Sequence, residues 1–416
     1  MKKGHFIIKV KPVAILAFFL VALLVRPSGM GDLLSTLNTP VKYLQILSAI
    51  IIAFFTIIYK RQPNLSLVLL LAYYVLVFGV SYFIKKSEPM FAEACSCIAL
   101  SLFSYLAYEK HGDDLIEGYS KYYLFIIVIQ MIMTIFGFGL YERAATGLFS
   151  NRNHMIRFFL PGLCFTFLDS VDRKNKIWTV SSVLYAACFT YLILFGASGT
   201  GKMAYLAFAI PFILFYKREI PKLFSVFNCA IYSAVVFILI YYFRIQYYLD
   251  FIIVNFLHKD PSFTKRIYIW ERAISYIKEN PLFGLGSYTS YANYLNGNMH
   301  AHQYWLQLLI SGGFIGLILI LLIYFIASKN LQSKKGLIGS TIITITIISY
   351  LVSGIDEALT HSEMLLPLLV LASMYGNSNE YFMATVRRTR SSLFHRLNDG
   401  TKGEKNARSQ PSKNIR

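Results

Sequence analysis

The sequence predicts an all-α, polytopic integral membrane protein of about 12 transmembrane helices. Apolar residues make up 56% of its 416 residues and charged residues only 15%, a charged share well below that of a soluble protein. Several uninterrupted apolar runs reach the roughly 20 residues that a helix needs to cross the hydrocarbon core of a bilayer. Basic residues gather in the connections between these runs, as expected of loops that alternate across a membrane.

Each apolar run is an expected helix, and most connections are short enough to join antiparallel neighbours. An even number of spans returns both termini to one side, and a cytoplasmic N-terminus puts most of the 40 Lys and Arg residues inside. Residues 1–376 then form one integral membrane domain. The polar, basic residues 377–416 form a cytoplasmic tail that is expected to be disordered. The expected helices lie near residues 8–25, 41–59, 66–84, 90–108, 122–140, 155–170, 177–196, 203–217, 223–243, 303–327, 336–353 and 362–376.

The formal net charge of +19 fits either a nucleic acid partner or a membrane surface. The basic residues form no stripe on a soluble domain, which argues against nucleic acid. The positive-inside rule and the anionic headgroups of membrane lipids account for the same charge. We therefore expect membrane lipid, and no nucleic acid, as a partner.

One long polar segment, residues 244–302, interrupts the apolar pattern and is expected outside the cytoplasm. Residues 264–279 within it have helical periodicity, with apolar residues on one face and charged residues off that face. Such an amphipathic helix lies against the membrane surface or against the helix bundle. Pro281 ends the helix, and Gly284 and Gly286 make the following turn pliable. The apolar face comprises Ile267, Trp270, Ile274 and Ile277, and the charged residues are Arg266, Arg272, Lys278 and Glu279.

The charged and titratable residues of this loop suit a phosphate-bearing lipid. Arg266 lies in the first turn of the expected helix, where a guanidinium can bind two phosphate oxygens, although a solvated surface charge is the commoner role. Arg272 has the same chemistry and the same two interpretations. His300 and His302 fit a general base, a metal ligand or an interfacial histidine. Since no third ligand lies nearby in the sequence, we expect no metal there.

Lys202 follows a glycine-rich segment, Gly196-Ala-Ser-Gly-Thr-Gly201, that is similar to a phosphate-binding P-loop. Met203 stands where a P-loop has its magnesium-binding Ser or Thr, and the segment follows a membrane helix instead of a buried strand. A nucleotide site is therefore excluded. Two interpretations of Lys202 stay open, a cation for a diphosphate and a lysine that extends from the membrane to the interface.

A second expected outer loop carries cations and amides, among them Arg143, Asn151 and Asn153. These groups suit sugar hydroxyls or phosphate, and they equally suit an ordinary polar turn. A further outer cluster lies beside the last expected span and comprises Asp356, Glu357, His361 and Glu363.

The residues from Arg266 to Gly316 resemble the O-antigen ligase and polymerase family of bacterial polysaccharide assembly. Gln303 stands where members typically carry Asn, and Lys202 stands where they usually carry Arg. The loop Gly147-x-Phe149-x-Asn151-x-Asn153 is also similar to the family's. The main pattern runs from Arg266 and Trp270 through Asn280-Pro281-x-x-Gly284-x-Gly286 to His302, Leu306, Gln307, Gly313 and Gly316.

The resemblance implies a helical, GT-C-like membrane glycosyltransferase that acts on the outer face of the bacterial cytoplasmic (inner) membrane. Its donor would be a glycan on undecaprenyl diphosphate, and no nucleotide sugar or other cofactor would be needed. Arg266 and His302 would be catalytic, with Arg266 holding the diphosphate and His302 taking the proton of the acceptor hydroxyl. The other expected substrate-binding residues are Lys202, Arg143, Asn151, Asn153, Arg272 and His300.

Family members differ in the acceptor that they use. A polymerase extends a lipid-linked repeat unit of O-antigen, capsule or exopolysaccharide, whereas a ligase transfers the glycan to lipid A core. Lys202 in place of Arg favours a polymerase, which would work beside a flippase and a chain-length regulator. A transporter of lipid-linked glycans stays an alternative, but Arg157 is the main charged residue inside an expected span, and transporters usually bury several.

Overall fold

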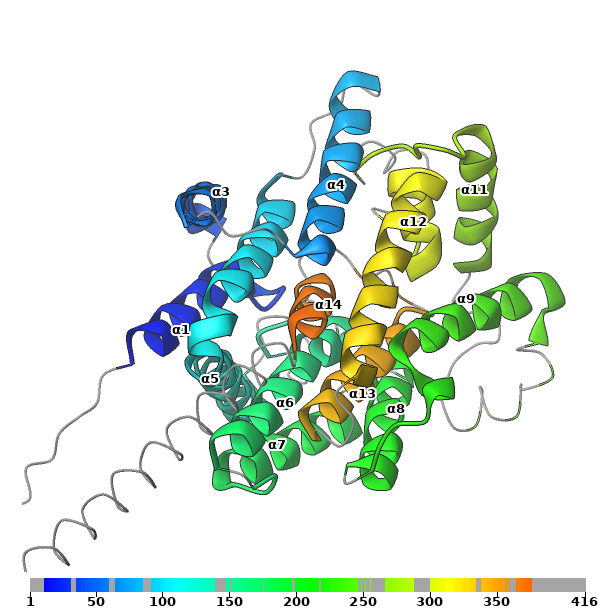
Figure 1. The fold of residues 1–416 in the computed structure, drawn as a ribbon. Helices are drawn as coiled ribbons and strands as arrows, with labels where there is room; N and C mark the ends of the chain where they lie inside the picture. Colours follow the sequence, from blue (N-terminus) through cyan, green and yellow to red (C-terminus); the bar gives the residue numbers. More distant parts are fainter. Residues whose placement is uncertain are drawn as a thin grey trace, which may run out of the picture.

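Helices form all the regular structure that the computed structural model describes (Figure 1). The described residues are 11–30, 35–59, 64–84, 91–138, 147–149, 152–174, 176–196, 199–216, 218–245, 248, 251, 255, 266–287, 300–333, 338–355, 357, 359 and 364–375. The first half of the chain contains α1 (Pro12–Leu24), α3 (Ser35–Ile58), α4 (Leu65–Gly79) with its π-helical extension η1 (Val80–Ile84), α5 (Phe91–Ile135), α6 (Arg152–Lys174) and α7 (Val180–Gly196). The second half contains α8 (Gly199–Phe215), the 3-10 turn η3 (Lys222–Phe224), α9 (Val226–Phe243), α11 (Arg266–Glu279), α12 (Tyr304–Ser333), α13 (Ile338–Ser353) and α14 (Leu365–Met374).

The apolar character of these helices makes the chain an integral membrane protein. Five of the described helices are long and apolar enough to cross a membrane, namely α3, α4 with η1, α5, α9 and α12. Five shorter helices, α1, α7, α8, α13 and α14, are also apolar. All twelve expected ranges overlap helix, and the all-α class is confirmed, while the number of spans stays a prediction.

Helix α5 corrects the expected connection between residues 108 and 122, because these residues are helical. The interruption is confined to His111, whose φ of −134° and ψ of 32° kink the helix. Charged residues there look like a loop in the sequence, but they are paired within the fold. Lys11 contacts Asp114 at 3.0 Å and the buried Glu117 at 2.6 Å. The N-terminal end of α1 therefore neutralises the charges that the helix carries.

Helix α6 is a buried core helix, and like α11 it is missing from the apolar helices. Residues 155–170 are all buried, and α6 packs against α5, α7, α8 and α13. Because neighbouring helices surround it, α6 can carry polar residues such as Arg157 and Asp169 that a lipid-facing helix would exclude. This helix brings its first turns to the polar end of the bundle.

The amphipathic helix expected at residues 264–279 is α11, and it packs against the bundle. Its buried residues are Ile267, Trp270, Ala273 and Ile277, while Ile274 is only partly buried. Trp270 is fully buried, with its ring edge-on to Phe237 of α9 at 5.3 Å. The expected apolar face is thus confirmed, shifted slightly toward Ala273, and it orients the start of α11 toward α12.

A break in α12 at Gly313 joins this helix to the turn that follows α11. Gly313 has a φ of 60° and a ψ of −161°, a conformation that is essentially restricted to glycine. The break frees backbone groups on both sides, and the turn Pro281–Gly286 pairs with them. Leu285 N and Gly286 N donate to Ile310 O and Ser311 O at 2.6 and 3.0 Å, and Phe314 N and Ile315 N donate to Pro281 O and Leu282 O at 2.8 and 3.2 Å.

The glycines of the Asn-Pro-x-x-Gly-x-Gly pattern allow the turn to approach this break closely. A Cβ on Gly284 would lie 2.5 Å from the carbonyl oxygen of Ile310, and one on Gly313 would lie 2.3 Å from that of Leu282. Neither position accepts a side chain without displacing backbone. The family-like spacing between Asn280 and Gly316 is therefore explained by docking of α11 onto α12.

We predict that Gly313→Ala destabilises the protein by roughly 2–4 kcal/mol, because both the backbone strain and the clash with Leu282 must be relieved. The measurement is thermal unfolding of the purified protein in detergent, followed by intrinsic fluorescence. Gly79→Ala is the matched control, since a Cβ at this helical position meets nothing within 4 Å. Equal unfolding temperatures for the two variants would contradict the proposed docking.

Candidate functional site

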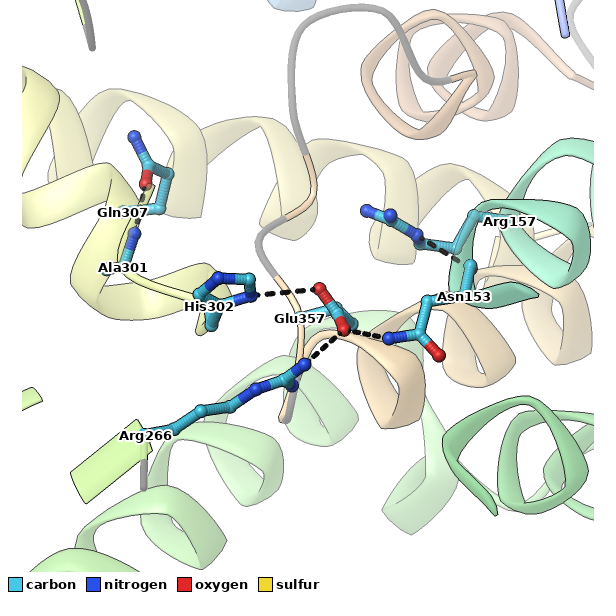
Figure 2. A network of polar contacts seen from close by, with 7 residues as sticks. All are labelled: Asn153, Arg157, Arg266, Ala301, His302, Gln307 and Glu357. Carbon is cyan, nitrogen blue, oxygen red and sulfur yellow. Dashed lines mark hydrogen bonds and ion pairs between the residues drawn. The ribbon is translucent and has the colours of Figure 1, made fainter. Parts of the chain in front are cut away.

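Glu357 is the centre of a polar network formed where several helices begin or end (Figure 2). Its Oε1 accepts a hydrogen bond from the Arg266 guanidinium at 2.7 Å and another from the side-chain amide of Asn153. Its Oε2 lies 3.3 Å from Nδ1 of His302. Only 5% of the Glu357 side chain is exposed, compared with 14% for Arg266 and 23% for His302. One buried carboxylate thus joins two helices and two connecting segments.

Four separate parts of the chain contribute to this network. Arg266 is the first residue of α11, and Asn153 lies in the first turn of α6. His302 precedes α12, and Glu357 follows α13. The segments before α12 and after α13 are tied together, because Tyr304 N donates to Gly354 O at 2.9 Å.

The backbone around His302 is held by side-chain amides of α12. Gln307 Oε1 accepts a hydrogen bond from Ala301 N at 3.0 Å, and Gln303 Oε1 caps the helix by accepting from Leu306 N at 2.7 Å. His302 itself has a φ of 50°, in the left-handed region that non-glycine residues seldom occupy. Such strain is typical of functional sites, and here it directs the imidazole toward Glu357.

Glu357 is ionised at neutral pH. Burial alone would raise its pKa, because a buried carboxylate loses its hydration. The hydrogen bond with His302 and the charges of Arg266 and Arg157 outweigh burial and hold the pKa of Glu357 well below its usual range. An ionised carboxylate can only accept hydrogen bonds.

This charge state fixes the tautomer of His302. Because Glu357 can only accept, the hydrogen of the neutral imidazole resides on Nδ1, the nitrogen that faces the carboxylate. The lone pair is then on Nε2, and the ring is partly exposed. A histidine held in this way by a carboxylate has the arrangement of a general base.

His300 lies directly beside His302, with the two ring centroids 4.0 Å apart. Burial lowers the pKa of His300 to about 3. His300 is therefore neutral at physiological pH and can offer a hydrogen bond to a substrate but no charge. Within the described residues, no group of three or more His, Cys, Asp or Glu side chains is arranged to hold a metal ion.

The structure brings Arg266, His302 and Asn153 into one network, with His300 beside them. Arg272 is exposed on α11. Lys202 lies in the first turn of α8, half-buried, and no hydrogen bond or ion pair joins it to the network among the described residues. Arg143 and Asn151 lie outside the described residues, as do Asp356, His361 and Glu363 of the second outer cluster.

Two residues of this site are missing from the sequence-based set of candidates. Glu357 belonged to a general acidic cluster, and nothing in its local sequence singles it out as the partner of Arg266 and His302. Arg157 carried a clearer signal, because a charged residue inside an expected span marks a functional site by default. Only 4% of Arg157 is exposed, its Nε donates to Asn153 O at 3.2 Å, and its guanidinium lies across Glu357 from Arg266 (Figure 2).

We predict that the ionised Glu357 makes the folded protein sensitive to acid. The unfolded chain binds a proton at Glu357 as the pH falls through about 4.3, whereas the folded protein does not, so stability is present above this pH and falls below it by up to about 1.4 kcal/mol per pH unit. Thermal unfolding measured between pH 7 and 3.5 should show a shallower loss for Glu357→Gln. Glu271→Gln, which removes an exposed carboxylate 3.2 Å from Arg244, should keep the slope of the natural protein. Identical slopes for all three proteins would contradict a depressed pKa at Glu357.

The comparisons with known proteins agree with this geometry. Residues 184–321 of the 416 match the family model described as O-antigen ligase, and no curated protein matches the sequence. The matched segment runs from α7 into α12 and includes Arg266 and His302, whereas Asn153, Arg157 and Glu357 lie outside it. The family carries out ligase or polymerase reactions of the glycosyltransferase type, which agrees with a basic site that contains an oriented histidine. The resemblance found in the sequence is thereby confirmed for residues 184–321, and this match supports the O-antigen ligase and polymerase family and an enzyme role for this membrane protein.

Proposed function

We propose that this protein is a polysaccharide polymerase that transfers a glycan from undecaprenyl diphosphate to a lipid-linked repeat unit of O-antigen, capsule or exopolysaccharide. The observation that carries the proposal is the shared carboxylate of Glu357, which holds a guanidinium and an imidazole side by side at one end of an apolar bundle. A cation next to an oriented base suits a diphosphate leaving group and a hydroxyl nucleophile.

Each member of the network has one task in this reaction. Arg266 binds the diphosphate and stabilises the negative charge that develops as the bond between the anomeric carbon and the phosphate oxygen breaks. The acceptor hydroxyl attacks that carbon and forms the new glycosidic bond, while Nε2 of His302 takes its proton. The diphosphate leaves with the electron pair of the broken bond. Lys202, Arg143, Asn151, Asn153, Arg272 and His300 are the proposed contacts to the remaining phosphate and sugar groups.

The proposed topology puts this chemistry on the outer face of the cytoplasmic membrane. Both termini are cytoplasmic, the loop of residues 244–302 is outside, and residues 377–416 form a cytoplasmic tail. The positive-inside distribution of Lys and Arg supports this orientation. A flippase that delivers the lipid-linked repeat unit and a chain-length regulator are the proposed partners. The energy of the diphosphate linkage drives transfer, so no nucleotide is required.

A ligase that transfers the glycan to lipid A core is the second candidate function. The matching family description names O-antigen ligase, and both reactions use the same donor chemistry. Lys202, where ligases usually have Arg, favours a polymerase. A transporter is disfavoured because Arg266, His302 and Glu357 meet where helices begin or end, at the start of α11, before α12 and after α13, whereas transporters bind their substrates near the bilayer midplane.

We predict that the purified protein builds a glycan ladder from synthetic undecaprenyl-diphosphate repeat units, without ATP and without lipid A core. Arg266→Ala and His302→Ala should each lower the rate by at least roughly 100-fold, because one loses the phosphate-binding cation and the other the base. Lys278→Ala is the matched control, an exposed cation on the same helix, and should retain full activity. The readout is a polysaccharide gel, with thermal unfolding as the check on folding.

Each alternative gives a different result in this assay. Transfer that begins only when lipid A core is added identifies a ligase. If the native repeat unit is supplied as donor and no glycan is transferred to either acceptor, the proposed enzymatic activity is overturned and a transporter is favoured. A ladder that survives both substitutions would show that the catalytic groups lie elsewhere.

We further predict inversion at the anomeric carbon, because a single displacement by one activated hydroxyl inverts the configuration of that carbon. The product linkage can be assigned by NMR from a two-unit product of known donor configuration. Retention of the donor configuration would require a covalent intermediate and would exclude His302 as a simple base.

A further inference from the structure

Arg266 has two tasks in the proposed reaction that compete with each other. In the structure its guanidinium neutralises Glu357 at 2.7 Å, and in the reaction it must bind the donor's diphosphate. When Arg266 turns to the diphosphate, Glu357 loses its closest countercharge while two new negative charges arrive. A buried carboxylate in that position would take up a proton. The protonated Glu357 would then no longer keep His302 in the tautomer whose lone pair is on Nε2.

Arg157 is placed to prevent this loss, because contacts within the core hold it in position. It is buried within α6, its Nε donates to Asn153 O at 3.2 Å, and its backbone carbonyl accepts from Tyr350 OH at 2.6 Å. Tyr350 belongs to α13, the helix that leads to Glu357. The same contact therefore sets both Arg157 and the segment that carries the carboxylate. Figure 2 shows the two guanidiniums on opposite sides of Glu357.

We propose that Arg157 is a positioning residue that keeps Glu357 ionised when the donor draws Arg266 away, and so keeps His302 oriented as a base. This inference rests on the proposed function, because it assigns Arg266 to the diphosphate. It gives Arg157 a role through Glu357 and no direct contact with the substrate. Among the residues that the structure describes, the charged or titratable groups that face Glu357 are Arg266 of α11, Arg157 and His154 of α6, and His300 and His302 before α12.

The test compares Arg157→Met and Arg157→Lys with the natural protein across a pH series, using whichever acceptor the natural protein accepts. Arg157→Met should lower kcat by roughly 10- to 100-fold and leave the KM for the donor within about threefold. The acidic side of the pH–kcat profile of Arg157→Met should move to higher pH, because Glu357 binds a proton more readily when Arg157 is missing. Arg157→Lys keeps a cation and should retain most of kcat. Arg218→Met, which removes an exposed arginine just beyond the far end of α8, is the matched control.

A double-mutant cycle separates a positioning role from a structural one. If Arg157 acts through Glu357, adding Arg157→Met to Glu357→Gln should cost little more than Glu357→Gln alone. If the double variant instead loses activity by the product of the two single losses, the inference is overturned. It is also overturned if Arg157→Met raises the KM for the donor and leaves the acidic side of the pH–rate profile unchanged, because that result indicates a direct contact between Arg157 and phosphate. If Arg157→Met does not fold, Arg157→Lys decides, and a loss as large as that of His302→Ala would overturn the inference.

A substrate-free measurement distinguishes failure of this inference from failure of the proposed function. Loss of Arg157 should raise the pKa of Glu357 in the folded protein, so the fall in stability as the pH drops below about 4.3 should become shallower and approach that of Glu357→Gln. An unchanged slope would overturn the coupling between Arg157 and Glu357, whatever reaction the protein catalyses. An altered slope in a protein that transfers no glycan would refute the proposed function and keep the coupling.

Discussion

The candidate site depends on one buried carboxylate, Glu357, and on the charges that keep it ionised. A buried carboxylate is unfavourable on its own, and two guanidiniums and a histidine make it tolerable. In return, the carboxylate contacts both Arg266 and His302 and so holds them side by side, as the proposed reaction of a diphosphate donor with a hydroxyl acceptor requires. The ion pair is therefore better understood as a positioning device than as a source of stability, since buried pairs seldom stabilise a fold by themselves.

The carboxylate can hold these groups only because the backbone brings α11 and α12 together. The break at Gly313 and the turn Pro281–Gly286 satisfy each other's backbone hydrogen bonds, which holds the two segments together. Gln307 then fixes the segment that carries His302, and Trp270 anchors the start of α11 against α9. The residues between Arg266 and Gly316 that match the family pattern form this scaffold, and few of them face the chemistry.

The sequence predicts the helices and a large part of the site, because both follow from local patterns. Apolar runs mark the helices, the spacing of Ile267, Trp270 and Ile277 marks the buried face of α11, and the family pattern marks Arg266 and His302. Glu357 and Arg157 depend on contacts between residues far apart in the chain, which no local pattern encodes. The helical residues after His111 were misassigned to a connection for the same reason, since their charges are paired with Lys11 on another helix.

The network cannot by itself distinguish a polymerase from a ligase. In the proposed mechanism both reactions break the same bond to a diphosphate and activate a sugar hydroxyl, so Arg266, Glu357 and His302 would perform the same steps in each. The choice of acceptor must then be made by groups that contact the acceptor beyond its reacting hydroxyl. This separation of chemistry from specificity explains how one site geometry serves a family with different acceptors, and it means that only transfer to a defined acceptor can decide between the two activities.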